Sequence, residues 1–176
     1  NASLAVLREI GVETGGSNVQ FGICPNTGRM VVIEMNPRVS RSSALASKAS
    51  GYPLAFVATK LALGYSLDQI GEMGTPNSAY TAPKVDYMIV KIPRWDLNKF
   101  YGVSHEIGSS MKSVGEVMSV GKSFEEIIQK GLRMIGQGMH GFVGNKEITF
   151  DNVEESLSKP TDLRIFAIAD AFEKGY

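Results

Sequence analysis

Several residue types are scarce in this 176-residue sequence. Its single cysteine, Cys24, excludes an intrachain disulfide and fits a reducing compartment, so we expect a cytoplasmic protein. The 18 lysines and arginines balance the 18 aspartates and glutamates, and this balance favours neither nucleic acid nor a membrane surface as a partner. No apolar run approaches the roughly 18 residues that a membrane span needs. Any recognition of an anion must therefore come from local groups.

Histidine is also scarce, since only His105 and His140 are present. Neither has a second histidine, cysteine or carboxylate at metal-ligand spacing, which argues against a zinc site or a histidine-based triad. Gly15-Gly16 precedes a predicted strand instead of following one, so it is not a dinucleotide-binding fingerprint. Cys24 has no fixed basic neighbour and is interpreted as an ordinary turn residue.

Turn residues and apolar alternation predict a mixed α and β chain with a β-hairpin near its start. The hairpin strands are predicted over 17–23 and 29–36, joined by Cys24-Pro25-Asn26-Thr27-Gly28. A strand over 85–92 is apolar on both faces and is expected to be buried on both. The other predicted elements are helices over 1–10, 42–50, 53–63, 123–135 and 162–174, a helical turn over 66–70, a strand over 115–120, and irregular segments over 71–83, 95–105 and 136–150.

The end of the second hairpin strand collects a carboxylate, an amide and two guanidiniums within eight residues, namely Glu34, Asn36, Arg38 and Arg41. Apolar residues alone would explain a strand, but not this set. Guanidinium forks bind carboxylate, bicarbonate or phosphate through two hydrogen bonds. A serine at position 40, 42 or 43 can cap the next helix, whose N-terminus favours an anion. The strand end therefore suits a site that holds a metal ion and an oxyanion together.

Pairing across the hairpin brings further polar groups to the same face. If the turn centres near Thr27, Gln20 lies opposite Glu34 and Asn18 opposite Asn36, with the odd-numbered apolar residues facing the core. Mg²⁺ prefers oxygen ligands, but one carboxylate with amides is a weak site without phosphate, so we predict a site for a metal–nucleotide complex. A one-residue bulge would split the set. A merely solvated polar face, with the arginines in surface ion pairs, is the alternative.

Longer motifs extend this pattern along the chain. They are Gly15-Gly16-Ser17-Asn18-Val19-Gln20-Phe21, the run from Ile33 to Ala49 that contains Arg38-Val39-Ser40-Arg41-Ser42-Ser43, Asp86-Tyr87, Lys91-Ile92-Pro93-Arg94, Met111-Lys112-Ser113-Val114-Gly115-Glu116-Val117-Met118, and Ile168-Ala169-Asp170-Ala171-Phe172. Together they resemble the large subunit of the carbamoyl phosphate synthetase family over almost the whole chain. The run after Asn36 is similar to the first of its two ATP-grasp halves, which phosphorylates bicarbonate.

This resemblance implies an α+β fold and two domains. Residues 1–150 would be the C-terminal part of the carboxyphosphate-forming ATP-grasp domain, with an antiparallel sheet and packed helices. Residues 151–176 would begin a helical oligomerisation domain. The family's adenine-binding region, glycine-rich lid and earlier arginines are absent from this sequence, which has no initiating methionine. We therefore expect a fragment of a longer protein that is inactive in isolation.

The resemblance also assigns ligands to the polar set. Gln20 and Glu34 would bind one Mg²⁺ or Mn²⁺ ion and approach ATP, and Glu34 and Asn36 would bind a second ion. Asn18 would help to shape the ATP pocket. Many ATP-grasp enzymes have a carboxylate at the position of Gln20, whereas this synthetase family has glutamine there, so the residue agrees with the family.

The implied catalytic residues are Arg38 and Arg41, which would hold bicarbonate or carboxyphosphate. The parent protein would be an ATP-dependent ligase that combines bicarbonate, ammonia and ATP into carbamoyl phosphate for arginine and pyrimidine biosynthesis. A glutaminase small subunit and further copies of the chain are implied partners, and the source of the ammonia stays open. Two alternatives also stay open: another bicarbonate-phosphorylating ATP-grasp ligase, such as a biotin carboxylase, and a non-catalytic assembly module.

Overall fold

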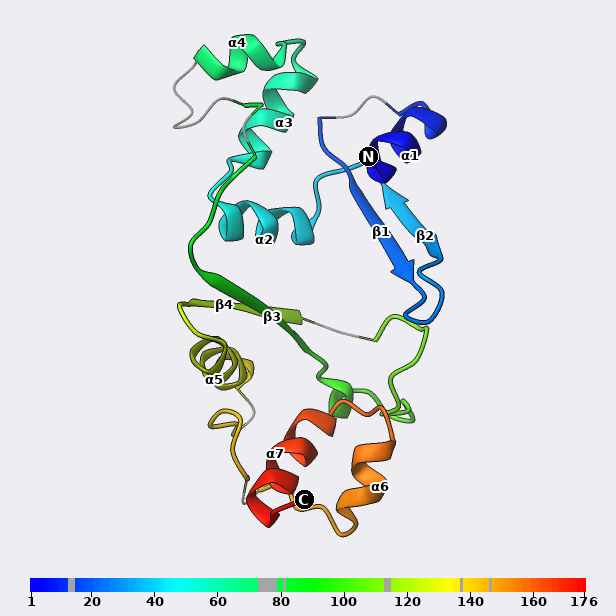
Figure 1. The fold of residues 1–176 in the computed structure, drawn as a ribbon, viewed down its shortest axis with the longest axis vertical. Helices are drawn as coiled ribbons and strands as arrows, with labels where there is room; N and C mark the ends of the chain where they lie inside the picture. Colours follow the sequence, from blue (N-terminus) through cyan, green and yellow to red (C-terminus); the bar gives the residue numbers. More distant parts are fainter. Residues whose placement is uncertain (13–14, 73–78, 81, 113–114, 137, 146) are drawn as a thin grey trace. The chain divides into compact units, whose positions relative to one another are not determined.

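The chain forms two compact units, residues 1–85 and 86–176, in the computed structural model (Figure 1). The structure describes residues 1–12, 15–72, 79–80, 82–112, 115–136, 138–145 and 147–176. None of the helices within these ranges has both the length and the apolar character needed to cross a membrane. The mixed α and β content agrees with the predicted fold class. Each unit contains its own two-stranded antiparallel sheet, together with helices.

The first unit combines a hairpin with short helices. Its elements are, in chain order, α1 (Ala2–Ile10), β1 (Asn18–Ile23), β2 (Met30–Asn36), α2 (Arg41–Ser50), α3 (Leu54–Ala62) and α4 (Leu67–Glu72). β1 and β2 pair in antiparallel fashion, as predicted. In their turn, the N–H of Gly28 donates to the carbonyl of Cys24 at 2.9 Å, and Gly28 has a φ of 68° that glycine adopts without strain. The turn prediction is therefore confirmed.

The hairpin contains a β-bulge, because its register shifts by one residue between Gln20 and Phe21. A Cβ built on Gly22 would meet the side chains of Val31 and Ile33 at 3.5 and 3.6 Å. These two residues therefore lie on the same face as Gly22 in the turn half of the hairpin. The sequence predicts Val31 and Ile33 on the face opposite to that of Gly22, and this prediction is wrong. The extra residue in β2 shifts the alternation of its side chains by one position on the turn side of the bulge.

Much of the apolar surface of the hairpin is exposed in this chain. Val31, Val32 and Ile33 are 45%, 50% and 64% exposed. Among the described residues, only β1 makes extensive contact with β2. The expectation that the odd-numbered residues of the hairpin face a core is therefore wrong for Val31 and Ile33. The core of this unit instead lies among the helices, where Val57, Ile70 and Ala79 are buried together.

The helices of the first unit begin and end near the predicted residues. α2 ends at Gly51, which has a left-handed φ of 71°, and α3 follows Pro53. The N–H of Ser66 donates to the side chain of Gln69 at 2.9 Å and stabilises the start of α4. Part of the loop predicted over 71–83 lies outside the described residues.

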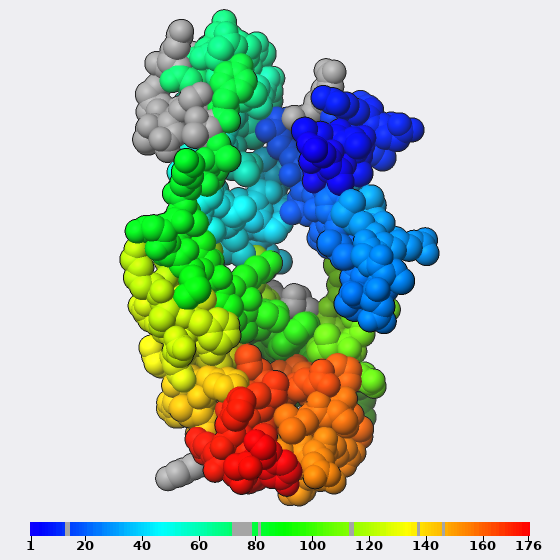
Figure 2. Space-filling view, in the orientation of Figure 1, coloured from blue at the N-terminus to red at the C-terminus, as the bar shows by residue number. Residues whose placement is uncertain are grey.

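The second unit packs helices on a second antiparallel ribbon. Its elements are β3 (Met88–Arg94), the 3₁₀ turn η1 (Leu97–Lys99), β4 (Gly115–Gly121), α5 (Phe124–Ile135), α6 (Val153–Ser158) and α7 (Arg164–Lys174). β3 pairs with β4, and α5 packs on both strands. Figure 2 shows α6 and α7, in orange and red, packed side by side. The N–H of Glu126 donates to the Ser123 hydroxyl at 3.2 Å, which confirms the predicted cap of α5.

β3 differs from its prediction in both position and burial. It begins three residues later than the predicted strand over 85–92, and Met88 is 39% exposed. Burial on both faces is therefore wrong: α5 covers one side, where Ile92, Leu132, Ile135, Met139 and Phe166 form the core. Phe166 belongs to α7, so the last helix contributes to this core. The compact unit over 86–176 accordingly includes the last two helices. The predicted domain division at 150/151 is not tested by this packing and stays a prediction.

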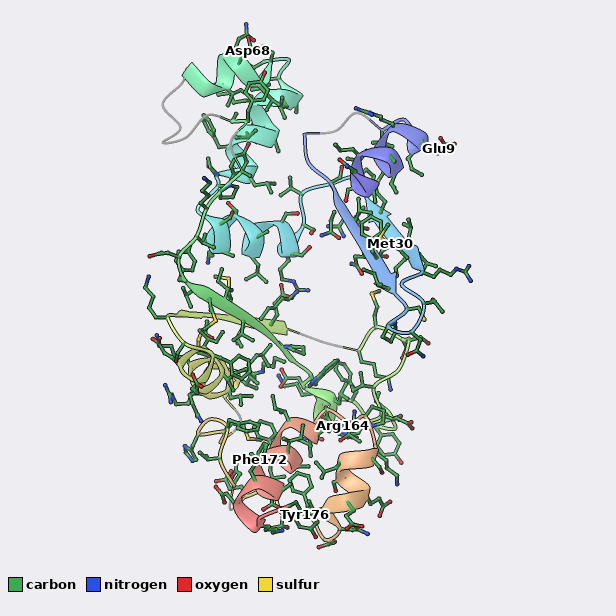
Figure 3. The ribbon with its side chains drawn as sticks, viewed as in Figure 1. Glu9, Met30, Asp68, Arg164, Phe172 and Tyr176 are labelled. Atoms are coloured by element: carbon green, nitrogen blue, oxygen red, sulfur yellow. The ribbon has the colours of Figure 1, made fainter. Side chains whose placement is uncertain are left out.

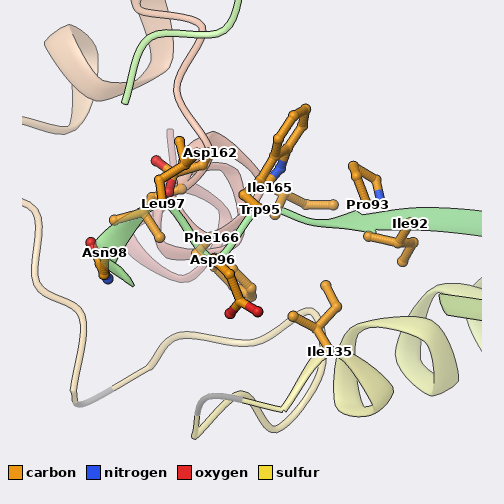
Figure 4. A pocket seen from close by; sticks show the side chains of 11 residues that line it. Ile92, Pro93, Trp95, Asp96, Leu97, Asn98, Ile135, Asp162, Ile165 and Phe166 are labelled. Carbon is orange, nitrogen blue, oxygen red and sulfur yellow. The ribbon is translucent and has the colours of Figure 1, made fainter. Parts of the chain in front are cut away.

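Asp96 is a buried charged residue at the edge of this core, 7% exposed and with a φ of 46°. Its Oδ2 atom accepts hydrogen bonds from Arg94 Nε at 2.9 Å and from Lys99 Nζ at 3.1 Å. Burial raises the pKa of this carboxyl, but the hydrogen bonds and charges of Lys99 and Arg94 outweigh burial and hold the pKa below its ordinary value. Asp96 lines a small pocket together with Ile135 and Phe166 (Figure 4).

The lowered pKa of Asp96 predicts an acid-sensitive second unit. Such a carboxyl adds stability above its unfolded pKa of about 4, and this stability is lost as the pH falls through the lower folded pKa. We expect the urea midpoint of the wild-type chain to fall between about pH 5 and about pH 3 more steeply than that of Asp96→Asn. Asp86→Asn is the control, because that carboxylate is 86% exposed and its ion pair with Lys122 contributes little. Equal slopes for wild type and Asp96→Asn would contradict this assignment.

Candidate functional site

A cluster of polar side chains lies at the open end of the hairpin, opposite its turn. Met30, which is labelled in Figure 3, is the first residue of β2 and belongs to the turn end. Gln20 Nε2 donates to Glu34 Oε1 at 2.9 Å, and Asn36 Nδ2 donates to the same oxygen at 3.1 Å. Both amides thus turn their NH₂ groups toward one carboxylate oxygen. Each amide oxygen therefore points away from Glu34 Oε1, and these hydrogen bonds do not by themselves bring the amide oxygens together with the carboxylate as metal ligands.

The strand register explains why these side chains meet. Gln20 pairs with Glu34 and Asn18 pairs with Asn36, as predicted from the turn. The bulge falls on the turn side of Gln20, so it does not divide the polar set. The structure therefore joins Gln20, Glu34 and Asn36 by hydrogen bonds, and places Asn18 beside them by register.

The chemistry of this cluster fits a hard divalent cation that brings its own anionic ligands. Mg²⁺ and Mn²⁺ take carboxylate, carbonyl and water oxygens, and Mg²⁺ is often held by one or two carboxylates plus substrate phosphates. Within the described residues, no group of three or more His, Cys, Asp or Glu is placed to bind a metal by itself. One carboxylate with two amides thus matches a metal–phosphate complex better than a bare ion.

The two predicted catalytic arginines follow the cluster in the segment that leads to α2. The N–H of Arg38 donates to the carbonyl of Asn36 at 2.9 Å, which closes a tight turn at the strand exit. Arg38 also lines a shallow hollow with Gly15 and Gly16 and with residues of α3. Arg41 is the first residue of α2 and is exposed. The hydrogen bonds of the polar cluster do not test the roles of these arginines, which stay predictions.

The start of α2 shows which of the three candidate serines is the cap. Ser40 is the N-cap, with extended backbone at φ −123°, and its N–H donates to Ser43 Oγ at 3.2 Å. The hydroxyls of Ser40 and Ser42 lie 2.7 Å apart. Ser43 is only 6% exposed, a feature that the sequence reasoning missed. The spacing of Ser40 and Ser43, which is that of the N-cap and N3 positions of a capping box, was a signal for their hydrogen bond but not for the burial.

Two family models and several known proteins match this chain. Residues 1–70 match the family model "Carbamoyl-phosphate synthase L chain, ATP binding domain", and residues 116–176 match "Carbamoyl-phosphate synthetase large chain, oligomerisation domain". The carbamoyl phosphate synthase large chain of Pseudomonas aeruginosa is 54% identical over 99% of this chain and 17% of its own length. The chain belongs to the carbamoyl phosphate synthase large-chain family. Family membership and a partial ATP-grasp fold are thereby confirmed.

Other large chains of this family match over the same span. Those of Archaeoglobus fulgidus and Helicobacter pylori are 50% and 54% identical, each over 99% of this chain. The chain spans 17% and 16% of these two relatives. The match to the ATP-binding domain supports ATP as a ligand, and the match to the oligomerisation domain supports oligomeric assembly. Neither the biotin carboxylase nor the purely structural alternative is favoured by these relatives.

Proposed function

We propose that this chain is the part of a carbamoyl phosphate synthetase large subunit that presents Mg²⁺- or Mn²⁺-bound ATP to bicarbonate. The observation that carries the proposal is the Glu34 carboxylate, held by the amides of Gln20 and Asn36 at the strand end that leads into Arg38 and Arg41. Glu34 and Gln20 would bind one ion, and Glu34 and Asn36 the second. The ions, when bound, neutralise charge on the ATP phosphates.

The reaction explains why carboxylate, amides and arginines belong together. Bicarbonate is a poor nucleophile, and its oxygen must attack the γ-phosphorus of ATP while the bond to the leaving ADP oxygen breaks. In our proposal Arg38 and Arg41 hold the bicarbonate anion in line for this attack, and Glu34 is fixed before the substrates arrive. The product, carboxyphosphate, is a mixed anhydride. Ammonia attacks its carbonyl carbon, and phosphate leaves to give carbamate.

The remaining assignments follow from the same proposal. A second phosphorylation, in the other ATP-grasp half of the parent protein, converts carbamate into carbamoyl phosphate. The parent would take ammonia from a glutaminase small subunit or from solution, act in the cytoplasm, and associate with further copies. Residues 151–176 would begin its oligomerisation domain, and Asn18 would shape the ATP pocket beside the cluster. The isolated 176-residue chain would be inactive, because it holds only part of the ATP site.

The decisive experiment measures the products of the full-length large chain that contains this sequence. We expect ATP hydrolysis that depends on bicarbonate, and labelled carbamoyl phosphate when ammonia is supplied. Carboxylation of biotin in its place would support the biotin carboxylase alternative and overturn our proposal. Calorimetric titration of the isolated chain with Mg-ATP is the companion test. We expect no saturable heat, whereas tight binding would contradict the expectation that this part alone has an incomplete ATP site.

A further inference from the structure

The segment between the polar cluster and α2 is anchored at both ends. At its start, the side chain of Asn36 donates to Glu34 at 3.1 Å, and the carbonyl of Asn36 accepts from the N–H of Arg38 at 2.9 Å. At its end, the N–H of Ser40 donates to Ser43 Oγ at 3.2 Å, and the carbonyl of Ser40 accepts from Ala44 at 3.0 Å. Only a few residues separate the two anchors, so the course of the backbone through both arginines depends on them.

The second anchor determines where α2 begins. Ser40 has extended backbone, whereas Arg41 is the first helical residue. The direction of a Cα–Cβ bond follows the backbone dihedrals of its residue, and helical residues tilt this bond toward the N-terminus of the helix. If α2 started one residue later, Arg41 would become the non-helical cap and its side chain would leave the chain in another direction. The direction in which the Arg41 side chain leaves the backbone is therefore set by whatever fixes the start of α2.

Ser43 accepts a hydrogen bond from the backbone at this start. It lies one turn into α2, it is 6% exposed, and its hydroxyl oxygen accepts the N–H of the cap residue. Being buried, it is not placed to contact a substrate directly. We propose that Ser43 is a positioning residue for bicarbonate binding, which acts by holding Arg41 at the first helical position. This inference rests on the proposed function, because it needs bicarbonate to be the anion that Arg41 holds.

The test compares variants of the full-length large chain by bicarbonate-dependent ATP hydrolysis. Ser43→Ala removes the acceptor, and we expect the KM for bicarbonate to rise by about tenfold, because the reciprocal capping bond that holds the helix start, and with it Arg41, is lost. The KM for ATP and kcat should stay within about twofold, because uniform binding of one substrate is what weakens. Ser43→Thr keeps a hydroxyl acceptor and should restore the bicarbonate KM.

A matched control lies at the far end of the same helix. Ser50 Oγ donates to the carbonyl of Ala46 at 2.7 Å, so Ser50→Ala also removes a hydroxyl hydrogen bond from α2. It should leave both KM values unchanged, and thermal unfolding should show all variants folded. A Ser43→Ala variant that loses only kcat, or whose bicarbonate KM is unchanged, would overturn the positioning role, as would failure of Ser43→Thr to restore it. A wild-type chain without bicarbonate-dependent hydrolysis would instead overturn the proposed function itself, and the inference with it.

Discussion

Replacing Glu34 by glutamine in the full-length large chain is expected to lower bicarbonate-dependent ATP hydrolysis by about a thousandfold. Metal ions contribute several kcal/mol of charge stabilisation in phosphoryl transfer, and a thousandfold loss corresponds to about 4 kcal/mol. Glutamine keeps the size of the side chain but removes its charge. Its carbonyl oxygen can still accept the hydrogen bonds that Gln20 and Asn36 donate to Glu34 Oε1, but an NH₂ group, which cannot bind a cation, then takes the place of Oε2. The variant thus weakens the proposed metal ligand while its two supporting amides can stay in place.

The Glu34→Gln result needs a control with the same chemical change elsewhere. Glu154, an exposed residue in the first turn of α6, provides it, and Glu154→Gln should change hydrolysis by less than about twofold, as expected for a surface site. Raising the concentration of Mg²⁺ or Mn²⁺ should partly restore Glu34→Gln, because the variant binds the ions less tightly. Normal bicarbonate-dependent turnover in Glu34→Gln would remove the basis of the proposed site.

The pairing within the site could be predicted from the sequence because two local rules agree. Alternation puts positions 34 and 36 on one face, and the turn around Thr27 brings Gln20 opposite Glu34. The bulge beside them could not be predicted, since one extra residue in β2 leaves no signature in an apolar run. Its position mattered more than its presence: one step further toward the open end, it would have divided the polar set.

Burial of the hairpin was predicted less well than its pairing. An apolar pattern indicates that a surface prefers to be covered, but it does not identify the covering element. Val31, Val32 and Ile33 satisfy the pattern and are still exposed in this chain. The same reasoning explains why contacts within an element, such as the caps of α2 and α5, agreed with prediction more closely than contacts between elements.

Two predictions for the second unit differ from the structure for local reasons: the end of β3 and the absence of α6 from the predicted elements. β3 also continues two residues past the predicted end at residue 92, through Pro93, although proline cannot donate to a neighbouring strand. Here it is tolerated opposite Glu116 in a sheet of two strands, each of which has one unpaired edge among the described residues. α6 was missed because it spans only six residues, too few for a periodic pattern. Its cap, in which Asn152 accepts from the N–H of Glu155 at 3.0 Å, was the available signal.

Leu132→Ala is expected to lower the free energy of unfolding of the second unit by about 2–5 kcal/mol. Leu132 lies in α5, is 0% exposed, and belongs to the same buried cluster as Ile92 of β3 and Phe166 of α7. Truncation removes apolar contacts and leaves a cavity that rigid neighbours fill only in part. Urea unfolding of the chain gives the measurement. Met134→Ala, in the same helix but 54% exposed, should cost less than about 0.5 kcal/mol.

The same variant also tests how far the second compact unit extends. If α7 is part of this core, Leu132→Ala and Phe166→Leu alter one shared cluster, and their effects should depart from additivity by about 0.5–3 kcal/mol. If α7 folds with another body, the two losses should add, because distant sites act independently. Additive losses would therefore contradict a unit that runs from residue 86 to residue 176, and would favour a structural boundary near the predicted division at residue 151. A large coupling would show instead that the start of the predicted oligomerisation domain completes the core of the sheet before it.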